Sequence, residues 1–293
     1  MRGKIVFAGL ILALSGACTG AQTAGSVPST TAGDIYCSGV VTSEAVPKDT
    51  FIITGEDSDQ RITFELGAYV YINKGAAQGV KVGDEFSVIR RVVDLTDEDW
   101  TKWQTSILHR IGNVWEDEGR LRVTVTEQNT SIAQISHSCG YMQRGDIVLP
   151  FTERPFPPRK SGDNFDRFAP PSGKAVAMLI TGRDFQVQYG VNDVVYVNLG
   201  SSQGVRVGDY LRIFRYNGTE HETAYQTGRF AFDSDGYLGV FGFGSVPARY
   251  NWGNVPRQVI GEGLVVRTGP NSSTVLITFS LSEMFAGDYV EIE

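Results

Sequence analysis

Apolar and polar residues alternate with a two-residue period in the first half of this chain, and that period is typical of β-strands. Residues 69–73 (YVYIN) place Val70 and Ile72 on one face and the tyrosines on the other, and residues 122–126 (RVTVT) alternate in the same way. The 34 glycines and the many Val, Ile, Thr, Tyr and Phe residues favour short strands and tight turns over helices. The pattern predicts an all-β fold.

A long part of this strand pattern occurs twice. Residues 70–90 (VYINKGAAQGVKVGDEFSVIR) and 195–215 (VYVNLGSSQGVRVGDYLRIFR) are identical at 11 of 21 positions without a gap. A second match, at a different offset, relates residues 119–148 to residues 261–290 and includes a closing Gly-Asp pair in each copy. Because internal repeats reveal architecture, the chain is predicted to contain two small barrel-like β-modules in tandem.

The centre of the repeated segment is predicted to be a turn between two strands. Glycine serves where φ must be positive, and an aspartate side chain accepts hydrogen bonds from neighbouring amides. The expected structural turn residues are Gly79, Gly83 and Asp84 in the first copy and Gly204, Gly208 and Asp209 in the second. Val80 and Val82 are expected to point the same way and close one end of a barrel. A ligand loop exposing Gln78 and Lys81 is the alternative, but turn chemistry already accounts for every repeated position.

The two modules are predicted to span residues 34–151 and 172–293. Residues 152–171 (TERPFPPRKSGDNFDRFAPP) contain five prolines and no periodicity, which predicts a semi-rigid, extended linker.

One helix is predicted, inserted in the first module between Arg91 and Arg120. Thr96 followed by Asp99 resembles a capping box, and Gly112 is a natural stop. Apolar residues recur between them at helical spacing: Trp100, Trp103, Ile107 and Ile111.

Charge and motifs exclude several functions. The net charge of −7, without a basic stripe, does not favour nucleic-acid binding. Nucleotide-binding loops, nucleophile elbows and zinc-protease helices are missing from the sequence. A hydrolase would need carboxylates that converge in a cleft. We therefore expect no enzymatic activity, no catalytic residue and no cofactor or metal.

The N-terminus is predicted to be an export signal over residues 1–17. Arg2 and Lys4 precede a short apolar segment, residues 5–14, which small residues follow. This segment is too short to cross a bilayer as a mature helix.

Cys18 directly follows the signal, as the lipidated cysteine does in bacterial lipoproteins, although Leu14 lies one position further upstream than usual. Residues 18–33 are small and polar and predict a flexible tether. The chain is therefore expected to be an outer-membrane lipoprotein that faces the periplasm. Ordinary signal cleavage, which would leave a soluble periplasmic or secreted protein, is the alternative.

Two cysteines remain, Cys37 near the start of the first module and Cys139 near its end. An even pair in an exported protein predicts a disulfide. His137 lies two residues before Cys139, so the three residues also offer three metal ligands or a thiol nucleophile with a base. The disulfide explains both cysteines without further assumptions and is the favoured interpretation.

Aromatic residues crowd an insertion in the second module, residues 217–259. They predict either core packing or an exposed binding surface, and the candidate surface residues are Tyr237, Phe241, Phe243, Tyr250 and Trp252.

The shared pattern V-x-x-N-x-G-x-x-x-G-V-x-V-G-D-x-[FL]-x-[VI]-x-R, with its closing G-D-[IY]-V, resembles the C-terminal β-module of bacterial flagellar assembly protein T. Similar modules occur in other exported envelope lipoproteins, some of them linked to peptidoglycan-binding domains. The flagellar protein has further N-terminal domains, whereas this chain has two copies of the module. The resemblance implies a β-fold and an envelope location.

The expected function is that of a non-catalytic cell-envelope lipoprotein, anchored to the membrane by its N-terminal lipid. It would act as a structural or assembly module through contacts with other envelope proteins. The alternative is a module that binds peptidoglycan or another glycan.

Overall fold

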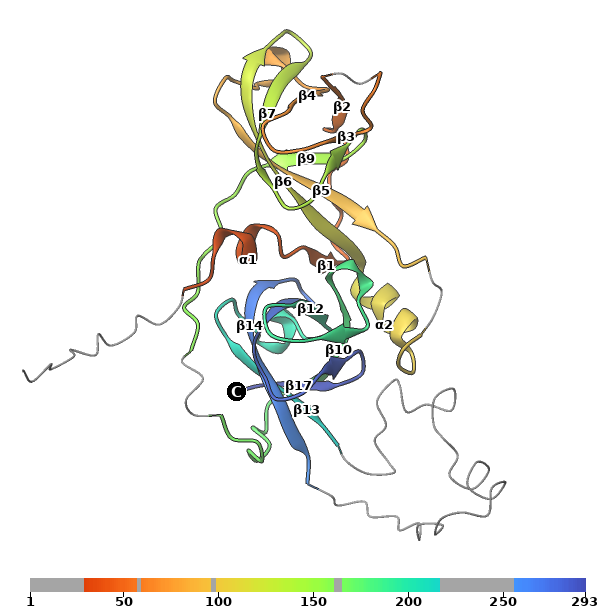
Figure 1. Cartoon of the computed structure of the whole chain (residues 1–293), viewed down its shortest axis with the longest axis vertical. Coiled ribbons are helices and arrows are strands. Elements are labelled where there is room, and N and C mark those ends of the chain that lie inside the picture. Colours follow the sequence, from red (N-terminus) through yellow and green to blue (C-terminus); the bar gives the residue numbers. More distant parts are fainter. Residues whose placement is uncertain (1–28, 57–58, 96–98, 161–164, 217–255) are drawn as a thin grey trace, which may run out of the picture.

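The computed structural model describes residues 29–56, 59–95, 99–160, 165–216 and 256–293. Strands dominate these residues and form two stacked β-modules, so the predicted all-β fold is confirmed (Figure 1). No helix among the described residues is both long and apolar enough to cross a membrane.

The first module is a curved sheet in the order β2-β4-β7-β6-β5-β9, with β1 added beside β6. Its strands are β1 (Val40–Thr42), β2 (Ile52–Gly55), β3 (Thr63–Phe64), β4 (Tyr69–Ile72), β5 (Glu85–Val92), β6 (Asn113–Thr126), β7 (Ser131–Ser138), β8 (Met142–Gln143) and β9 (Ile147–Pro150). The Ile52 amide donates to Asp146 O at 3.0 Å and the Val148 amide to Thr50 O at 2.9 Å. These bonds bring the first and last strands of the sheet together.

The second module is a closed barrel in the order β10-β12-β15-β14-β13-β17. Its strands are β10 (Val176–Gly182), β11 (Gln188–Tyr189), β12 (Val194–Val197), β13 (Tyr210–Arg215), β14 (Gln258–Thr268), β15 (Ser273–Ser280), β16 (Met284–Phe285) and β17 (Tyr289–Ile292). β4 to β9 recur as β12 to β17, and the small pairs β3–β8 and β11–β16 also correspond. The duplication in the sequence is therefore a duplication of the fold.

Each module buries its own apolar core, as strand alternation predicts. In β4, Val70 and Ile72 are fully buried and the two tyrosines are half-buried. The second core is larger and includes Leu179, Leu211 and Val275.

The repeated turns have nearly identical geometry. The φ angles of Gly79 and Gly83 are 87° and 93°, and those of Gly204 and Gly208 are 88° and 94°. The Asp84 carboxylate accepts a hydrogen bond from the Lys81 amide at 2.9 Å. Positive φ at these positions explains why glycine occupies them in both copies.

The prediction for Val82 was wrong. Val80 is buried in the core, but Val82 is 66% exposed. The Asp84 amide donates to Lys81 O at 3.1 Å, which closes a turn with Val82 at its tip. Val82 lies within the turn and Val80 precedes it, so the two valines do not share a face.

The helix of the first module, α2 (Gln104–Ile111), begins later than predicted. Trp103 has a φ of 68°, which is incompatible with the helix, and its side chain is 72% exposed. Asp99 still caps the helix, because its Oδ1 accepts a hydrogen bond from the Thr105 amide at 2.9 Å. Gly112 ends the helix as predicted.

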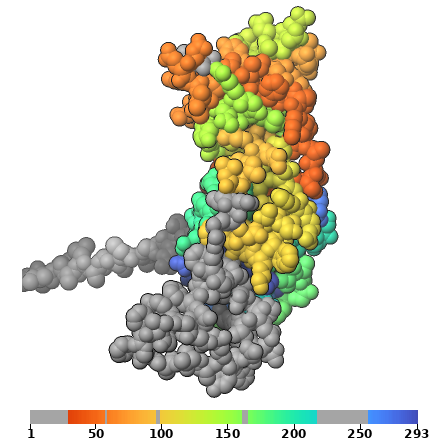
Figure 2. Space-filling view, turned by 90° about the vertical axis from the view of Figure 1, so that its right-hand side faces the viewer, coloured from red at the N-terminus to blue at the C-terminus, as the bar shows by residue number. Residues whose placement is uncertain are grey.

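α2 belongs to the first module in sequence but packs against the second. Ile107 and Leu108 contact the buried cluster that contains Ile111 and Ile180, and the side-chain Nε2 of Gln104 donates to Ile180 O at 2.7 Å. In Figure 2 the yellow segment around α2 lies below the first module and at the height of the second, whose teal and blue parts are visible on either side of it. The helix therefore helps to hold the modules together.

Candidate functional site

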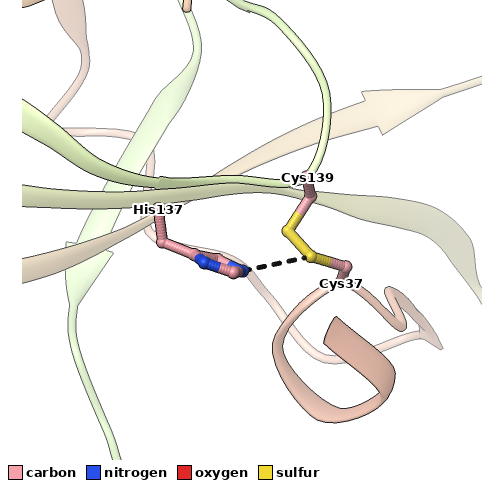
Figure 3. A group of neighbouring side chains, drawn as sticks. All are labelled: Cys37, His137 and Cys139. Atoms are coloured by element: carbon pink, nitrogen blue, oxygen red, sulfur yellow. Dashed lines mark hydrogen bonds between the residues drawn. A yellow bond between two sulfur atoms is a disulfide. The ribbon is translucent and has the colours of Figure 1, made fainter. Parts of the chain in front are cut away.

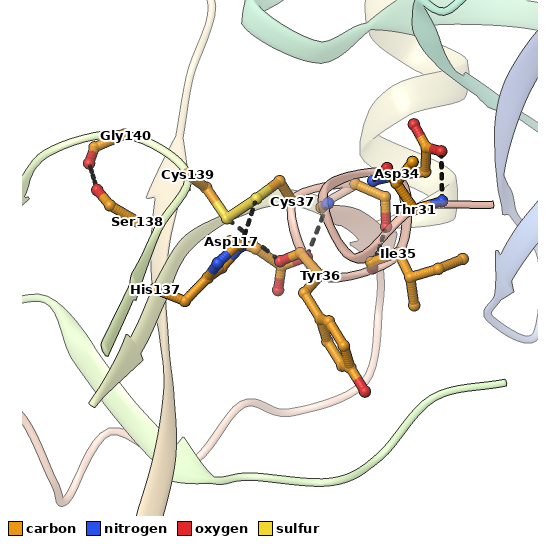
Figure 4. Close-up of a disulfide and its surroundings, with 12 residues drawn as sticks. Thr31, Asp34, Ile35, Tyr36, Cys37, Asp117, His137, Ser138, Cys139 and Gly140 are labelled. Carbon is orange, nitrogen blue, oxygen red and sulfur yellow. Dashed lines mark hydrogen bonds between the residues drawn. A yellow bond between two sulfur atoms is a disulfide. The ribbon is translucent and has the colours of Figure 1, made fainter. Parts of the chain in front are cut away.

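A short N-terminal segment lies across the junction of the two modules. It contains the helix α1 (Ala32–Tyr36), which begins inside the predicted tether and is capped by Thr31 and Asp34. Ile35 is fully buried against residues of the second module, whereas Cys37 is covalently bound to the first (Figure 4). β1 then pairs with β6 of the first module. The segment thus bridges both modules.

The predicted disulfide between Cys37 and Cys139 is confirmed. It joins the residue after α1 to the residue after β7, which are 102 positions apart in sequence. Figure 3 shows the His137 ring directed at this bond, with Nε2 3.4 Å from Cys37 Sγ. The disulfide therefore closes a long loop and fastens the junction segment to the first module.

Asp117 is the electrostatic centre of the junction. Its buried carboxylate accepts a hydrogen bond from the Gly39 amide at 2.9 Å and two from the Arg154 guanidinium at 3.0 Å. Arg267 of the second module approaches within 3.6 Å. Burial and the neighbouring Arg154 lower the pKa of Arg267, although Asp117 opposes that shift. One carboxylate thus connects the N-terminal segment, the linker and both modules.

The first part of the linker packs against the modules instead of spanning open solvent. Arg154 contacts Asp117 and also donates to Ile35 O at 2.8 Å. Arg159 pairs with Asp34 at 2.9 Å, and the Thr30 hydroxyl donates to Pro157 O at 3.0 Å. The N-terminal segment and the linker therefore hold each other in place along the junction.

An acidic cavity of about 340 Å³ opens beside the disulfide. Its lining residues include Cys37, Cys139, Arg90, Arg183, Glu116 and Glu118. Burial raises the pKa of Glu118 to about 7, although its Oε1 lies 3.0 Å from Arg90 Nη1. Arg90 also binds Asp146 through two hydrogen bonds, so Glu118 shares its cation with another carboxylate.

Glu118→Gln is expected to reduce the pH dependence of folding stability. A carboxyl whose pKa is raised by folding contributes stability below its unfolded pKa near 4.5 and loses that stability as the pH rises through about 7. At pH 8 the variant should therefore be more stable than the wild type by roughly 1 kcal/mol, because solvent screening and the lost pairing with Arg90 reduce the effect of the pKa shift. Urea unfolding at pH 5 and pH 8 measures the difference. The control is Glu65→Gln, because Glu65 is exposed. If the free energies of unfolding of the wild type and of Glu118→Gln depended equally on pH, Glu118 would not cause the pH dependence.

A repeated ion pair explains residues whose partnership the sequence did not reveal. Arg90 ends the first repeated segment, and its Nε lies 2.7 Å from Asp146 Oδ1 in the closing Gly-Asp pair. Arg215 and Asp288 repeat this arrangement, also at 2.7 Å. Burial raises the pKa of Asp288, and Arg215 counteracts that shift. The coincidence of a repeated arginine and a repeated aspartate was the signal that could have shown the pairing.

The repeated glutamine also has a structural role. Gln78 Oε1 accepts a hydrogen bond from the Gly75 amide at 2.9 Å, and Gln203 accepts one from Gly200 at the same distance. These bonds cap the short 3₁₀ turns Ala76–Gln78 and Ser201–Gln203. Turn formation thus accounts for the glutamines.

The two turns differ in what covers them. A Cβ placed on Gly208 would lie 3.7 Å from Pro157 of the linker, whereas one placed on Gly83 would meet nothing within 4 Å. Val207 is half-buried, but its counterpart Val82 is exposed. The linker therefore covers this edge of the second module and leaves the same edge of the first module open. We call residues 81–86 the open edge.

A cavity of about 590 Å³ adjoins the open edge. Its lining combines apolar residues, such as Phe86 and Pro150, with the acidic Asp49, Asp84 and Glu85. The corresponding cavity of the second module measures about 520 Å³ and includes Tyr210. Tyr210 contacts the linker, because Lys160 lies over its ring at 4.1 Å and the Lys160 amide donates to its hydroxyl.

Some predicted site residues lie outside the described residues. They are the lipidation site Cys18 and the aromatic residues Tyr237, Phe241, Phe243, Tyr250 and Trp252. The export signal, residues 1–17, also lies outside them.

No protein-family model matches the chain, and no similar sequence is found among curated proteins. The resemblance to flagellar assembly protein T therefore depends on the sequence motifs alone.

Proposed function

We propose that this chain is an exported structural or assembly protein of the bacterial cell envelope that acts through protein–protein contacts. The observation that carries the proposal is the open edge. The same surface of the second module is covered by a linker segment of the chain itself, Pro157 to Lys160. A surface that binds an extended segment in one copy of a module is suited to bind one in the other copy.

The chemistry of the edge specifies the kind of segment it would accept. The linker contributes a proline against Gly208 and a lysine over the Tyr210 ring. In the first module, Arg120 stacks on Phe151 at 3.6 Å and pairs with Glu85 at 3.4 Å, so a cation of the same module lies beside that edge. The exposed Val82 and the apolar cavity wall remain for a partner. An extended, proline-containing protein segment fits this surface.

Two features support the envelope location. The signal-like residues 1–17 precede Cys18, as in lipoproteins, and a disulfide is the form expected of paired cysteines outside the reducing cytoplasm. We propose that Cys18 carries a lipid anchor on the outer membrane and that the modules face the periplasm.

A photo-crosslinking amino acid at Val82 is expected to give an adduct with an envelope protein in living cells. Mass spectrometry identifies the partner, and the purified partner should bind the wild-type chain but bind Val82→Asp at least tenfold more weakly, because the charge would be desolvated in the contact. The crosslinker at half-buried Val207 should give no intermolecular adduct, because the linker packs beside the neighbouring Gly208.

The matched control is Leu66→Asp, since Leu66 is 65% exposed and Val82 is 66% exposed. Equal binding by the Val82→Asp and wild-type chains would contradict the proposal.

The alternative proposal is glycan binding through the aromatic insertion, and a pull-down with purified sacculi separates the two. Retention of the wild-type chain that is lost on replacing Tyr237, Phe241 and Trp252 with alanine would favour the glycan. Labelling of the wild type but not of Cys18→Ala with a radioactive fatty acid tests the anchor independently.

A further inference from the structure

Three potential metal ligands converge at the end of β7. The ligand atoms of Cys37, His137 and Cys139 all lie within 4.8 Å of one another (Figure 3). We propose that, when the disulfide is reduced, these three residues bind a thiophilic metal ion, with Zn²⁺ as the representative. The disulfide and the metal complex would then be two states of the same site.

The disulfide alone does not explain His137. A disulfide needs two cysteines, yet the imidazole Nε2 lies 3.4 Å from Cys37 Sγ. The second module provides an internal comparison, because Phe279 and Leu281 occupy the positions of His137 and Cys139. Phe279 lies in β15 of the closed barrel, and Leu281 follows that strand. The histidine and the cysteines are therefore an addition that the fold of the module does not require.

The junction holds Cys37 in place by contacts that do not depend on the disulfide. The Cys37 amide donates to Gly33 O at 3.0 Å, and Arg183 Nη1 donates to Cys37 O at 3.2 Å. On the other side, the Cys139 amide donates to Glu118 O at 3.0 Å, and His137 lies within the paired strand β7. Reduction would leave both thiols beside the imidazole, so the ligands would be pre-organised for a metal ion.

The cavity beside the disulfide allows a metal ion to reach the cysteines. Both cysteines line the cavity of about 340 Å³, together with Glu116, Asp117, Glu118 and Asp184 and two arginines. Arg154 and Arg267 also pair with Asp117 from outside this lining, so the carboxylates of the cavity already have cationic partners. An ion in the cavity would reach the sulfur atoms directly.

The ligand set selects the metal. Two thiolates and one imidazole prefer Zn²⁺ and Cu⁺ to the hard cations Mg²⁺ and Ca²⁺. Three protein ligands leave one position of a tetrahedral zinc site for water or for a ligand that enters through the cavity. The site would therefore differ from a closed structural zinc site with four protein ligands.

Reduction of the disulfide precedes metal binding. A dithiol reductant transfers two electrons and two protons to the disulfide, which breaks the S–S bond, forms two thiols and leaves the reductant as a disulfide. Metal binding then releases the two thiol protons to solvent, because the thiolates and the neutral imidazole are the ligands. The affinity of the reduced site for the metal ion should therefore increase with pH.

Cobalt absorption spectroscopy tests the site in the Cys18→Ser chain, in which Cys37 and Cys139 are the two remaining cysteines. The chain is reduced with a dithiol, desalted without oxygen and titrated with Co²⁺. We expect one equivalent to bind with thiolate charge-transfer absorption, Zn²⁺ to displace it, and the oxidised chain to give no such signal. Cys139→Ser should abolish the signal, and His137→Gln should weaken cobalt binding by at least about tenfold, because it removes one of the three ligands.

His109→Gln is the matched control, because His109 is an exposed histidine on α2 and should bind cobalt as the parent does. Circular dichroism of the reduced parent and of Cys37→Ser/Cys139→Ser verifies that the fold is retained. The proposal is overturned if His137→Gln binds as tightly as the parent, if the reduced chain binds less than one equivalent, or if Cys139→Ser retains the signal.

Discussion

Asp117→Ala is expected to destabilise the protein by about 3–5 kcal/mol, because it removes one partner of a buried ion-pair network. The variant would leave the Gly39 amide without its acceptor and would place the Arg154 and Arg267 guanidiniums together without the carboxylate that they share. Urea unfolding at pH 7 measures the loss. Limited proteolysis between residues 151 and 160 should also accelerate, because the linker is released from the junction.

Two further variants separate charge from shape at this position. Asp117→Asn retains an acceptor for the Gly39 amide and should therefore lower the free energy of unfolding by less than Asp117→Ala does. Adding Arg267→Leu to Asp117→Ala should recover part of the lost stability, because it removes one of the two facing cations. If Asp117→Ala changed stability by less than 1 kcal/mol, the junction would not depend on this carboxylate.

Loss of the disulfide is expected to have the second largest effect. The Cys37→Ser/Cys139→Ser variant should lose about 3–4 kcal/mol, somewhat less than the roughly 4.7 kcal/mol that chain entropy assigns to a loop of 100 residues. A value below that limit is expected because residual structure in the unfolded chain reduces the entropy that the cross-link removes. Urea unfolding of the variant and of the wild type, each with and without reductant, gives the value.

Reductant should destabilise the wild type and leave the double variant unchanged. A metal chelator must be present in these measurements, because a metal ion bound by the reduced site would add stability. A variant as stable as the oxidised wild type would show that the disulfide contributes nothing to folding.

Comparison of the two modules shows which structural features the sequence patterns predicted correctly. The repeated glycines at 79 and 83 predicted the turns correctly, because positive φ is a local property of the backbone. The position of Val82 was predicted incorrectly, because a two-residue period does not continue through a turn. α2 began later than predicted, since aromatic residues at helical spacing do not reveal a backbone reversal at Trp103.

The candidate site was predictable only in part. The disulfide was predicted from two cysteines in a chain whose first residues resemble an export signal. Its position at a junction between modules did not follow, because the contacts of Asp117 with Gly39, Arg154 and Arg267 join residues far apart in sequence. A single sequence contains no periodic or local signal for such contacts.

The β-fold, its duplication, the turn geometry and the disulfide could be predicted from the residues alone, because alternation, repetition, backbone preference and cysteine pairing appear in neighbouring or repeated residues. Only the folded chain shows that α2 and the N-terminal segment hold the modules together and that the linker covers one edge but not the other. These features arise from packing between distant segments, whose complementarity of shape and charge exists only once the chain has folded.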